Sequence, residues 1–470
     1  MVFSSPIFLF IFLPLTLICN LLIGLTKNIK CNNVCLLIFS IIFYAYGSLK
    51  FLPILLASIL INYILSIFID KSEDKKLRYI LLVVAVSLNV ALLFVYKYLN
   101  LFSGFILGKV NATNIILPIG ISFYTFQVIS YIVDVYRKDV KHSDSIIDFA
   151  LFAMLFAQLI AGPIVRYKTI ERELKYRTVT TDSFSYGIKR FMIGFAKKII
   201  FANALGKVSD LAFANLNLHC LGKLLTVLVV ICYSIQIYLD FSAYSDMAIG
   251  IGKMLGFNFE ENFNLPFIAK SITEFWKRWH ISLSSFFRDY VYIPLGGSRK
   301  GIVRTCINLT IVFVLSGFWH GASFNFLFWG LYNALFIVVE RLVSYKYKYK
   351  FYIPETLRVL YVFIVWNIGM ILFRLESLSD IKLLYEGFIN GPSFNMWSRE
   401  VLSAIYNPYF IIIFFISILY ITPLFKNIQN YLYRLKYGFI AVDVVVIFLF
   451  VYAVIEMLTT GYNPFIYFRF

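Results

Sequence analysis

Apolar segments long enough to cross, or nearly cross, a lipid bilayer recur from one end of the chain to the other. The polar stretches between them are short, and none is long enough for a large soluble domain. A bilayer core is about 30 Å thick and takes about 20 helical residues to cross, so this pattern predicts an all-α, multi-pass membrane protein. The apolar segments are residues 6–25, 34–47, 51–69, 79–96, 115–133, 147–161, 222–239, 303–319, 324–340, 356–374, 408–424 and 438–457.

Composition agrees with this class. Of the 470 residues, 60% are hydrophobic and 14% charged, and the mean hydropathy is +0.80, whereas about 25% of a soluble domain is charged. The 43 Lys and Arg residues outnumber the 25 Asp and Glu residues, but they lie in short loops. We therefore expect contact with membrane lipids and no nucleic acid. The first apolar segment lacks a basic start and a cleavage site, so we expect it to be a retained helix.

Loop charge predicts the topology. Basic residues follow the first, third and fifth apolar segments, which places the amino terminus outside the cell membrane and those loops in the cytoplasm. Two segments, 147–161 and 222–256, break the alternation because both of their ends carry basic residues. Gly162 and Pro163 would end a helix after the first of them. We predict that both segments are re-entrant and line a cavity, because lipid cannot satisfy irregular backbone.

Several kinds of chemistry lack their sequence signals. The chain has no phosphate-binding loop, no H-E-x-x-H, no G-x-S-x-G and no carboxylates at metal-ligand spacing. Its six cysteines lie mostly in or beside apolar segments, where we expect small buried hydrophobic side chains and neither a zinc site nor disulfides. We predict no metal and no bound cofactor.

One of the four histidines lies deep in an apolar segment, in LSGFWHGAS, residues 315–323. A helix starting near Arg304 would rise about 24 Å before His320, at about 1.5 Å per residue. Ionisable groups at such depth usually face a cavity or a partner, and Gly317 and Gly321 would let a backbone or a substrate approach. A neutral imidazole there could take the proton of a hydroxyl that attacks a thioester, which is acyl transfer. The alternative is a histidine that only packs.

A second histidine lies in FWKRWHISLSSFFRDYVYIPLGGSRKG, residues 275–301. Helical spacing would place His280 on an apolar face, where it either packs against tryptophan or takes part in the chemistry. The residues of this predicted face are Trp276, His280, Leu283, Phe287 and Val291.

Charged residues near this helix have two open interpretations each. Lys277 and Arg278 either contact lipid headgroups or hold the phosphates of a soluble donor. Asp289 could simply pair with Arg288. In YLDFSAYSDMAIGIG, residues 238–252, two carboxylates either position an acceptor or water or serve as helix caps that line the cavity. They are Asp240 and Asp246.

Five long motifs occur in an order that resembles the membrane-bound O-acyltransferase family. The resemblance covers most of the chain, is strongest from about 118 to 335, and is closest to the bacterial branch of alginate O-acetyltransferase-like proteins. The motifs are PIGISFYTFQVISYIVDVYR (118–137), QLIAGPIVR (158–166), YLDFSAYSDMAIGIGKMLGF (238–257), FWKRWHISLSSFFRDYVYIPLGGSRKG (275–301) and SGFWHGASFNFLFWG (316–330).

This resemblance implies one membrane domain over residues 1–470, a ring of about 11–13 tilted transmembrane helices with re-entrant elements around a central funnel or tunnel. It implies that His320 is catalytic and His280 its companion. The acyl group would come from a thioester co-substrate, acetyl-CoA or an acyl carrier, and would reach an extracytoplasmic polysaccharide, often with partner or relay proteins of the envelope. The further candidate substrate-binding residues are Lys277, Arg278, Arg288, Asp289, Trp319, Asp240, Asp246 and Gln158.

Two alternatives stay open. The related teichoic-acid D-alanyl transfer branch ranks second because YVYIPLGGSRKG, which follows the shared R-D-Y, is typical of the alginate-type branch. A transporter or flippase would also contain re-entrant elements and carboxylates in the membrane, but often has internal repeats, and we detect none.

Overall fold

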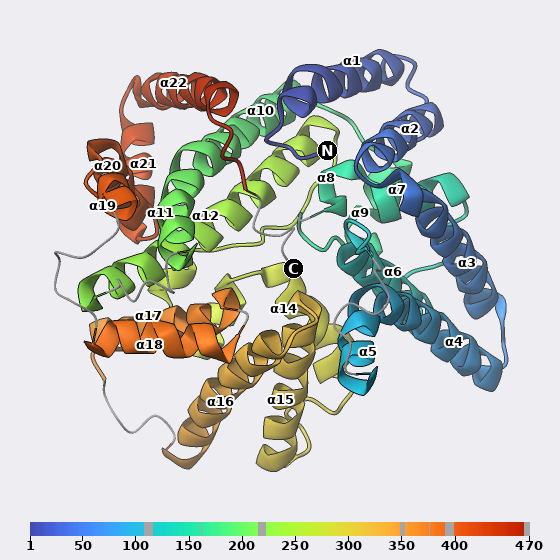
Figure 1. Cartoon of the computed structure of the whole chain (residues 1–470). Helices are drawn as coiled ribbons and strands as arrows, with labels where there is room; N and C mark the ends of the chain where they lie inside the picture. Colours follow the sequence, from blue (N-terminus) through green and yellow to red (C-terminus); the bar gives the residue numbers. More distant parts are fainter. Residues whose placement is uncertain are drawn as a thin grey trace. The chain divides into compact units, whose positions relative to one another are not determined.

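The chain is built of helices (Figure 1) and divides into two compact units. The first comprises Met1–Phe191 and Tyr244–Glu261, and the second comprises Met192–Ala243 and Asn262–Phe470. The expectation of a single membrane domain over residues 1–470 stays a prediction. The computed structural model describes residues 1–107, 116–160, 162–214, 222–347, 353–375, 377–390 and 399–464.

Helices make up both units, and the described ranges contain no strand. The helices of the first unit are η1 (Phe8–Phe12), α1 (Leu13–Gly24), α2 (Ile29–Ser48), η2 (Leu49–Phe51), α3 (Leu52–Lys71), α4 (Lys75–Leu93), η3 (Phe94–Tyr98), α5 (Leu99–Leu107), α6 (Ile121–Arg137), α7 (Ile146–Met154), α8 (Phe156–Leu159), α9 (Tyr167–Lys175) and most of α10 (Thr181–Ala196). Helix α12 (Lys223–Met254) contributes residues to both units.

The second unit contains the longer apolar helices of the carboxyl-terminal half. Its helices are η4 (Lys197–Ala202), α11 (Asn203–Ala214), η6 (Pro266–Ile268), α13 (Ile272–Arg278), α14 (Ile281–Phe287), η7 (Arg288–Tyr292), α15 (Gly301–His320), α16 (Phe324–Tyr347), α17 (Glu355–Arg374), α18 (Leu378–Asn390), α19 (Arg399–Ile405), α20 (Pro408–Tyr420), α21 (Pro423–Arg434) and α22 (Gly438–Thr459).

Every apolar segment predicted from the sequence contains a helix, which confirms the all-α, multi-pass membrane class. By length and composition, seven helical runs of the described residues could cross a membrane, or up to eight if one bent pair is a single span. The number of about 11–13 crossings stays a prediction. The seven are Ile29–Lys71, Lys75–Ser103, Lys223–Met254, Gly301–His320, Phe324–Lys346, Glu355–Arg374 and Gly438–Thr459.

The prediction of a re-entrant element over residues 222–256 is wrong. This segment contains one unbroken helix, α12, whose 32 residues span about 48 Å at 1.5 Å per residue. The prediction rested on basic residues at both ends of the segment and on polar residues within its apolar pattern, including the carboxylates of Asp240 and Asp246. In the structure both carboxylates lie inside α12 and pair with cations, so they neither cap nor interrupt the helix. Within its most apolar window, 78% of α12 is buried.

Breaks in the helical pattern occur elsewhere. Helix α7 ends at Met154 and α8 covers only Phe156–Leu159, so neither could cross a core of about 30 Å. Whether residues 147–161 enter and leave on one side stays a prediction; Ala161 lies outside the described residues. A second break separates α20 from α21, which are bent by 82°. Helix α20 has 13 residues and is also too short to cross alone.

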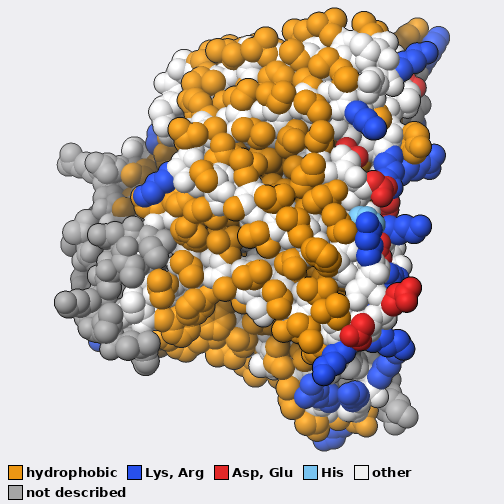
Figure 2. Space-filling view, turned by 90° about the vertical axis from the view of Figure 1, so that its right-hand side faces the viewer, with side chains coloured by type: hydrophobic (Ala, Val, Ile, Leu, Met, Phe, Trp, Pro, Cys, Tyr) orange, Lys and Arg blue, Asp and Glu red, His pale blue; other side chains and the backbone are white. Residues whose placement is uncertain are grey.

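Large hydrophobic side chains cover much of the surface over the part of the chain where α3 and α4 lie (Figure 2). Lysine and arginine side chains gather at one edge of this apolar surface. Only 17% of the most apolar window of Lys75–Ser103 and 11% of that of Gly438–Thr459 are buried. Exposed apolar helices of this length are the expected faces toward lipid.

Candidate functional site

The first candidate histidine ends a helix that packs tightly against its neighbour. His320 is the last residue of α15, and its side chain is buried. A Cβ atom at Gly317 would overlap the carbonyl oxygen of Phe326 on α16, and one at Gly330 would overlap the carbonyl oxygen of Phe313 on α15. The prediction that glycine beside His320 permits close backbone approach is therefore confirmed at Gly317, because α15 and α16 are in direct backbone contact there.

This contact between helices places His320 within a group of aromatic rings. Its ring centroid lies 4.9 Å from that of Trp329 on α16 and 5.1 Å from that of Phe373 on α17, each with edge-to-face geometry. It also lies 4.9 Å from the ring of Trp319. An imidazole held on three sides by large buried rings has little freedom to change its orientation.

The second candidate histidine begins a helix, and the prediction of one helical face through residues 276–291 is wrong. Helix α13 ends at Arg278, and His280 precedes α14 with φ +45° and ψ +55°. Such left-handed backbone is uncommon outside glycine and cannot continue an α-helix. Hydrogen bonds to a buried side chain 18 positions away stabilise this turn, and helical spacing could not predict them.

That side chain is Asn262. Its Oδ1 atom accepts hydrogen bonds from the backbone N–H of Ser282 at 3.2 Å and from the Ser282 hydroxyl at 2.9 Å, and it lies 3.2 Å from His280 Nδ1. A backbone N–H can only donate, so the atom facing all three groups is the amide oxygen. His280 Nδ1 therefore carries the proton, and His280 Nε2 is left with a lone pair.

Burial keeps the His280 ring neutral. The side chain is 1% exposed, lies outside the seven candidate spans, and desolvation lowers its pKa to about 3. The unfolded chain would bind a proton at its ordinary pKa of about 6.5. Below that pH the unfolded state binds more protons than the folded state, so this burial lowers the stability as the pH falls from about 6.5 toward 3.

Trp319 joins the two histidines. Its ring centroid lies 5.6 Å from that of His280 and 4.9 Å from that of His320. Phe241 of α12 packs edge-on against the other side of His280, at 4.7 Å. Three of the predicted site residues, two imidazoles and one indole, therefore come together in the second unit.

Most of the predicted cations are already paired. Arg278 forms an ion pair with Glu274 at 2.9 Å, and Arg288 pairs with Asp289 at 2.7 Å, as the sequence allowed. The exposed Lys277 has no hydrogen-bond or ion-pair partner within the described ranges. A phosphate-binding role for these residues stays a prediction, and Lys277 is the cation whose charge is least compensated.

The two predicted carboxylates also have partners. Asp240 and Lys198, each 3% exposed, pair at 2.8 Å in the second unit. In the first unit, Arg190 pairs with Asp246 at 2.7 Å and with Glu261 at 2.6 Å. Neither carboxylate caps a helix, so the helix-cap alternative is wrong. Each carboxylate instead compensates the positive charge of a cation beside a buried helix.

Gln158 lies in the first unit, in α8. Its side chain is fully buried and donates a hydrogen bond to the carbonyl oxygen of Phe152. This bond ties α8 back to α7, and a substrate-binding role for Gln158 stays a prediction. No group of three His, Cys, Asp or Glu residues in the described ranges could hold a metal ion. The cysteines that the structure describes are free, and Cys220 lies outside them.

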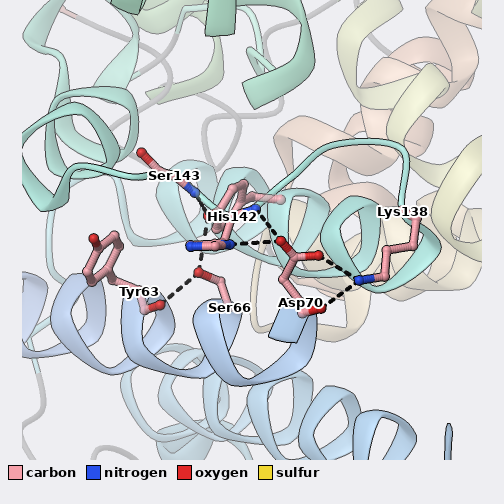
Figure 3. Close-up of polar contacts among 7 residues, drawn as sticks. Tyr63, Ser66, Asp70, Lys138, His142 and Ser143 are labelled. Atoms are coloured by element: carbon pink, nitrogen blue, oxygen red, sulfur yellow. Dashed lines mark hydrogen bonds and ion pairs between the residues drawn. The ribbon is translucent and has the colours of Figure 1, made fainter. Parts of the chain in front are cut away.

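Sequence reasoning missed a polar cluster in the first unit (Figure 3). Asp70, near the end of α3, lies between Lys138, whose Nζ is 2.7 Å from Oδ1, and His142, whose Nδ1 is 2.8 Å from Oδ2. Next to it, the Tyr131 hydroxyl donates to Ser66 at 3.1 Å. Lys138 and His142 lie 68 and 72 positions from Asp70 in the chain, so no spacing in the sequence indicates this cluster. This cluster fastens the loop after α6 to α3.

No sequence pattern indicated Asn262 either. Its role in orienting His280 can be tested with a variant. Replacing it with leucine removes the acceptor that orients His280, so we expect kcat for acyl transfer to fall by at least about tenfold. The loss of buried hydrogen bonds should lower the free energy of unfolding by about 1–3 kcal/mol. Both can be measured on detergent-purified protein. Asn264→Leu, at an exposed position nearby, is the matched control. Equal activity of Asn262→Leu and wild type would refute the role of Asn262.

Comparison with known proteins identifies the family of this chain. Residues 38–379 match the model of the membrane-bound O-acyltransferase family. The chain is 37% identical to a probable alginate O-acetylase of Pseudomonas putida over 100% of both chains, and 41% identical to one of Pseudomonas aeruginosa over 86% of this chain and 77% of that one. It is 32% identical to a peptidoglycan O-acetyltransferase of Helicobacter pylori, over 91% and 87%. This chain, with its two buried histidines, belongs to the membrane-bound O-acyltransferase family and is an acyltransferase.

Proposed function

We propose that this protein transfers an acetyl group from a cytoplasmic thioester to a hydroxyl group of an extracytoplasmic polysaccharide, or to a partner protein that relays it. The relatives named for alginate and peptidoglycan acetylation support an acetyl donor and a polymer acceptor. The observation that carries the proposal is the arrangement of two buried histidines on either side of Trp319. We also propose that the protein lies in the cytoplasmic membrane with its amino terminus outside the cell.

In the proposed mechanism, His320 accepts the proton of the acceptor hydroxyl while the hydroxyl oxygen attacks the thioester carbonyl carbon. The carbon–sulfur bond then breaks, and the leaving thiolate takes the proton from His320. The products are an ester and a free thiol, so atoms and charge balance. His280, whose Nδ1 proton is fixed by Asn262, offers a neutral Nε2 acceptor that orients a group or shares the proton.

Thiol release tests this function. Purified protein in lipid nanodiscs would be given acetyl-CoA or an acetylated carrier protein, together with alginate oligosaccharides or peptidoglycan fragments. We expect free thiol to appear in step with O-acetyl ester, measured by a thiol-reactive dye and by mass spectrometry. The productive pair of substrates identifies donor and acceptor. Transport of polymer or lipid without thiol release would instead support the transporter alternative.

The teichoic-acid alternative can be separated in the same assay. A D-alanyl thioester would replace the acetyl thioester, and a polyglycerol phosphate the polysaccharide. We expect no ester from this pair, because YVYIPLGGSRKG follows the shared R-D-Y in this chain. Preferential transfer of D-alanine would overturn the acetyl assignment and leave the acyltransferase assignment intact.

A further inference from the structure

Three tryptophans of the second unit bury indole N–H groups that lack a hydrogen-bond partner anywhere in the described parts of the chain. Buried indole N–H groups usually have an acceptor, and a buried donor without one needs an explanation. These tryptophans are Trp276, Trp329 and Trp366, with side chains 8%, 1% and 4% exposed.

One of the three donors lies beside the candidate catalytic base. The ring of Trp329 contacts that of His320 at 4.9 Å, and Phe373 contacts both rings, at 5.4 and 5.1 Å. Trp366 instead contacts Phe275, Trp276 and Trp279 and neither histidine.

The Trp329 nitrogen faces a glycine of helix α17. Its Nε1 lies 3.9 Å from the position that a Cβ atom at Gly369 would occupy. Gly369 lies one helical turn before Phe373 on α17, the residue whose ring touches His320. Gly369 therefore places no side chain against the Trp329 N–H, on the same face of α17 as the ring that contacts His320. The Tyr332 ring also lies 3.2 Å from this Cβ position.

Acyl transfer produces an oxygen atom that could accept a hydrogen bond from the Trp329 N–H. When the hydroxyl oxygen bonds to the thioester carbon, the carbonyl oxygen becomes an oxyanion, and it returns to a carbonyl as the carbon–sulfur bond breaks. A fixed donor in a buried site stabilises this charge more strongly than it stabilises the ground state. We propose that the Trp329 indole N–H donates a hydrogen bond to this oxygen and is a catalytic residue. The inference rests on the proposed function.

A matched pair of variants tests the role of this donor. Trp329→Phe removes the N–H beside His320, and Trp366→Phe removes an equally buried N–H that contacts no histidine. In thiol release from acetyl thioester, we expect Trp329→Phe to lower kcat by about 10²-fold and to leave KM within about twofold. Trp366→Phe should stay within about threefold of wild type. Equal losses in both variants would refute a specific donor.

Ligand binding separates this role from packing. Two analogues of S-acetylphosphopantetheine, the part that coenzyme A and acyl carriers share, serve as probes. One is a trifluoromethyl ketone with a methylene in place of sulfur, whose hydrate resembles the tetrahedral intermediate, and the other is an S-ethyl thioether without the carbonyl. We expect Trp329→Phe to weaken ketone binding by about tenfold and to leave thioether binding unchanged, which also shows that the variant is folded.

The outcomes are distinct. Equal weakening of both analogues would overturn the donor role. Wild-type kcat in Trp329→Phe would also overturn it, and would mean that the Trp329 N–H binds only water. If wild-type protein releases no thiol from any thioester, the proposed function fails and this inference fails with it. Thiol release by wild type with no effect of Trp329→Phe leaves the proposed function standing.

Discussion

The variant His320→Ala is expected to lose acyl transfer by at least about 10³-fold, within the range that general bases contribute. Its membrane insertion and yield should match those of wild type. Alanine cannot take the hydroxyl proton. The His280 imidazole lies on the other side of the Trp319 ring, and burial lowers its pKa to about 3, so it is too weak a base to replace His320. The measurement is O-acetyl ester on the acceptor polymer, together with thiol release by purified protein.

Two controls make the His320→Ala result specific. His142→Ala removes a different histidine, one that pairs with Asp70 in the first unit (Figure 3), and should retain acyl transfer. His320→Gln keeps a polar side chain of similar size, yet should be as inactive as the alanine variant because an amide is not a base. Wild-type ester levels in His320→Ala would contradict the assignment of His320 as the base.

The largest effect on stability is expected from Asp240→Asn. This change leaves the ammonium of Lys198, which is 3% exposed, without its counter-charge. Removing one member of a buried ion pair typically costs about 3–5 kcal/mol. Lys198 also donates to Asn203 at 2.9 Å and to the backbone carbonyl of Pro464, but neither group carries a charge. Thermal unfolding in detergent should therefore show a markedly lower midpoint.

Matched variants separate charge from packing at Asp240. The double variant Lys198→Met, Asp240→Leu removes both charges and should recover most of the lost stability. Lys382→Met breaks an exposed pair with Glu386 in the same unit and should change stability by less than about 1 kcal/mol. If Asp240→Asn melts within the error of wild type, the pair does not stabilise the fold, and a role for Asp240 in substrate binding regains support.

Much of this protein could be predicted from the order of its residues. Each apolar segment contains a helix, because a chain in lipid must satisfy its backbone hydrogen bonds within the segment itself. The isolated His320 in an apolar run indicated a functional group, since an ionisable side chain at that depth is costly. The prediction of helices succeeds because it depends on local properties, the length and apolarity of a single stretch, while the role of His320 stays a prediction.

Predictions that depended on partners failed. Asp240 and Asp246 indicated an interrupted helix, but α12 continues because Lys198 and Arg190 neutralise them. The helical face through His280 was wrong because Asn262 holds the turn at its start.

The sequence alone determined the class of protein and the positions of most of its helices, and it indicated His320 as the candidate base. Only the tertiary structure decided which charges are compensated, which nitrogen of His280 carries its proton, and that Trp329 and Phe373 surround His320. The physical reason is that helix formation is set by neighbours along the chain. The state of a buried polar group is instead set by atoms that folding brings to it from distant positions.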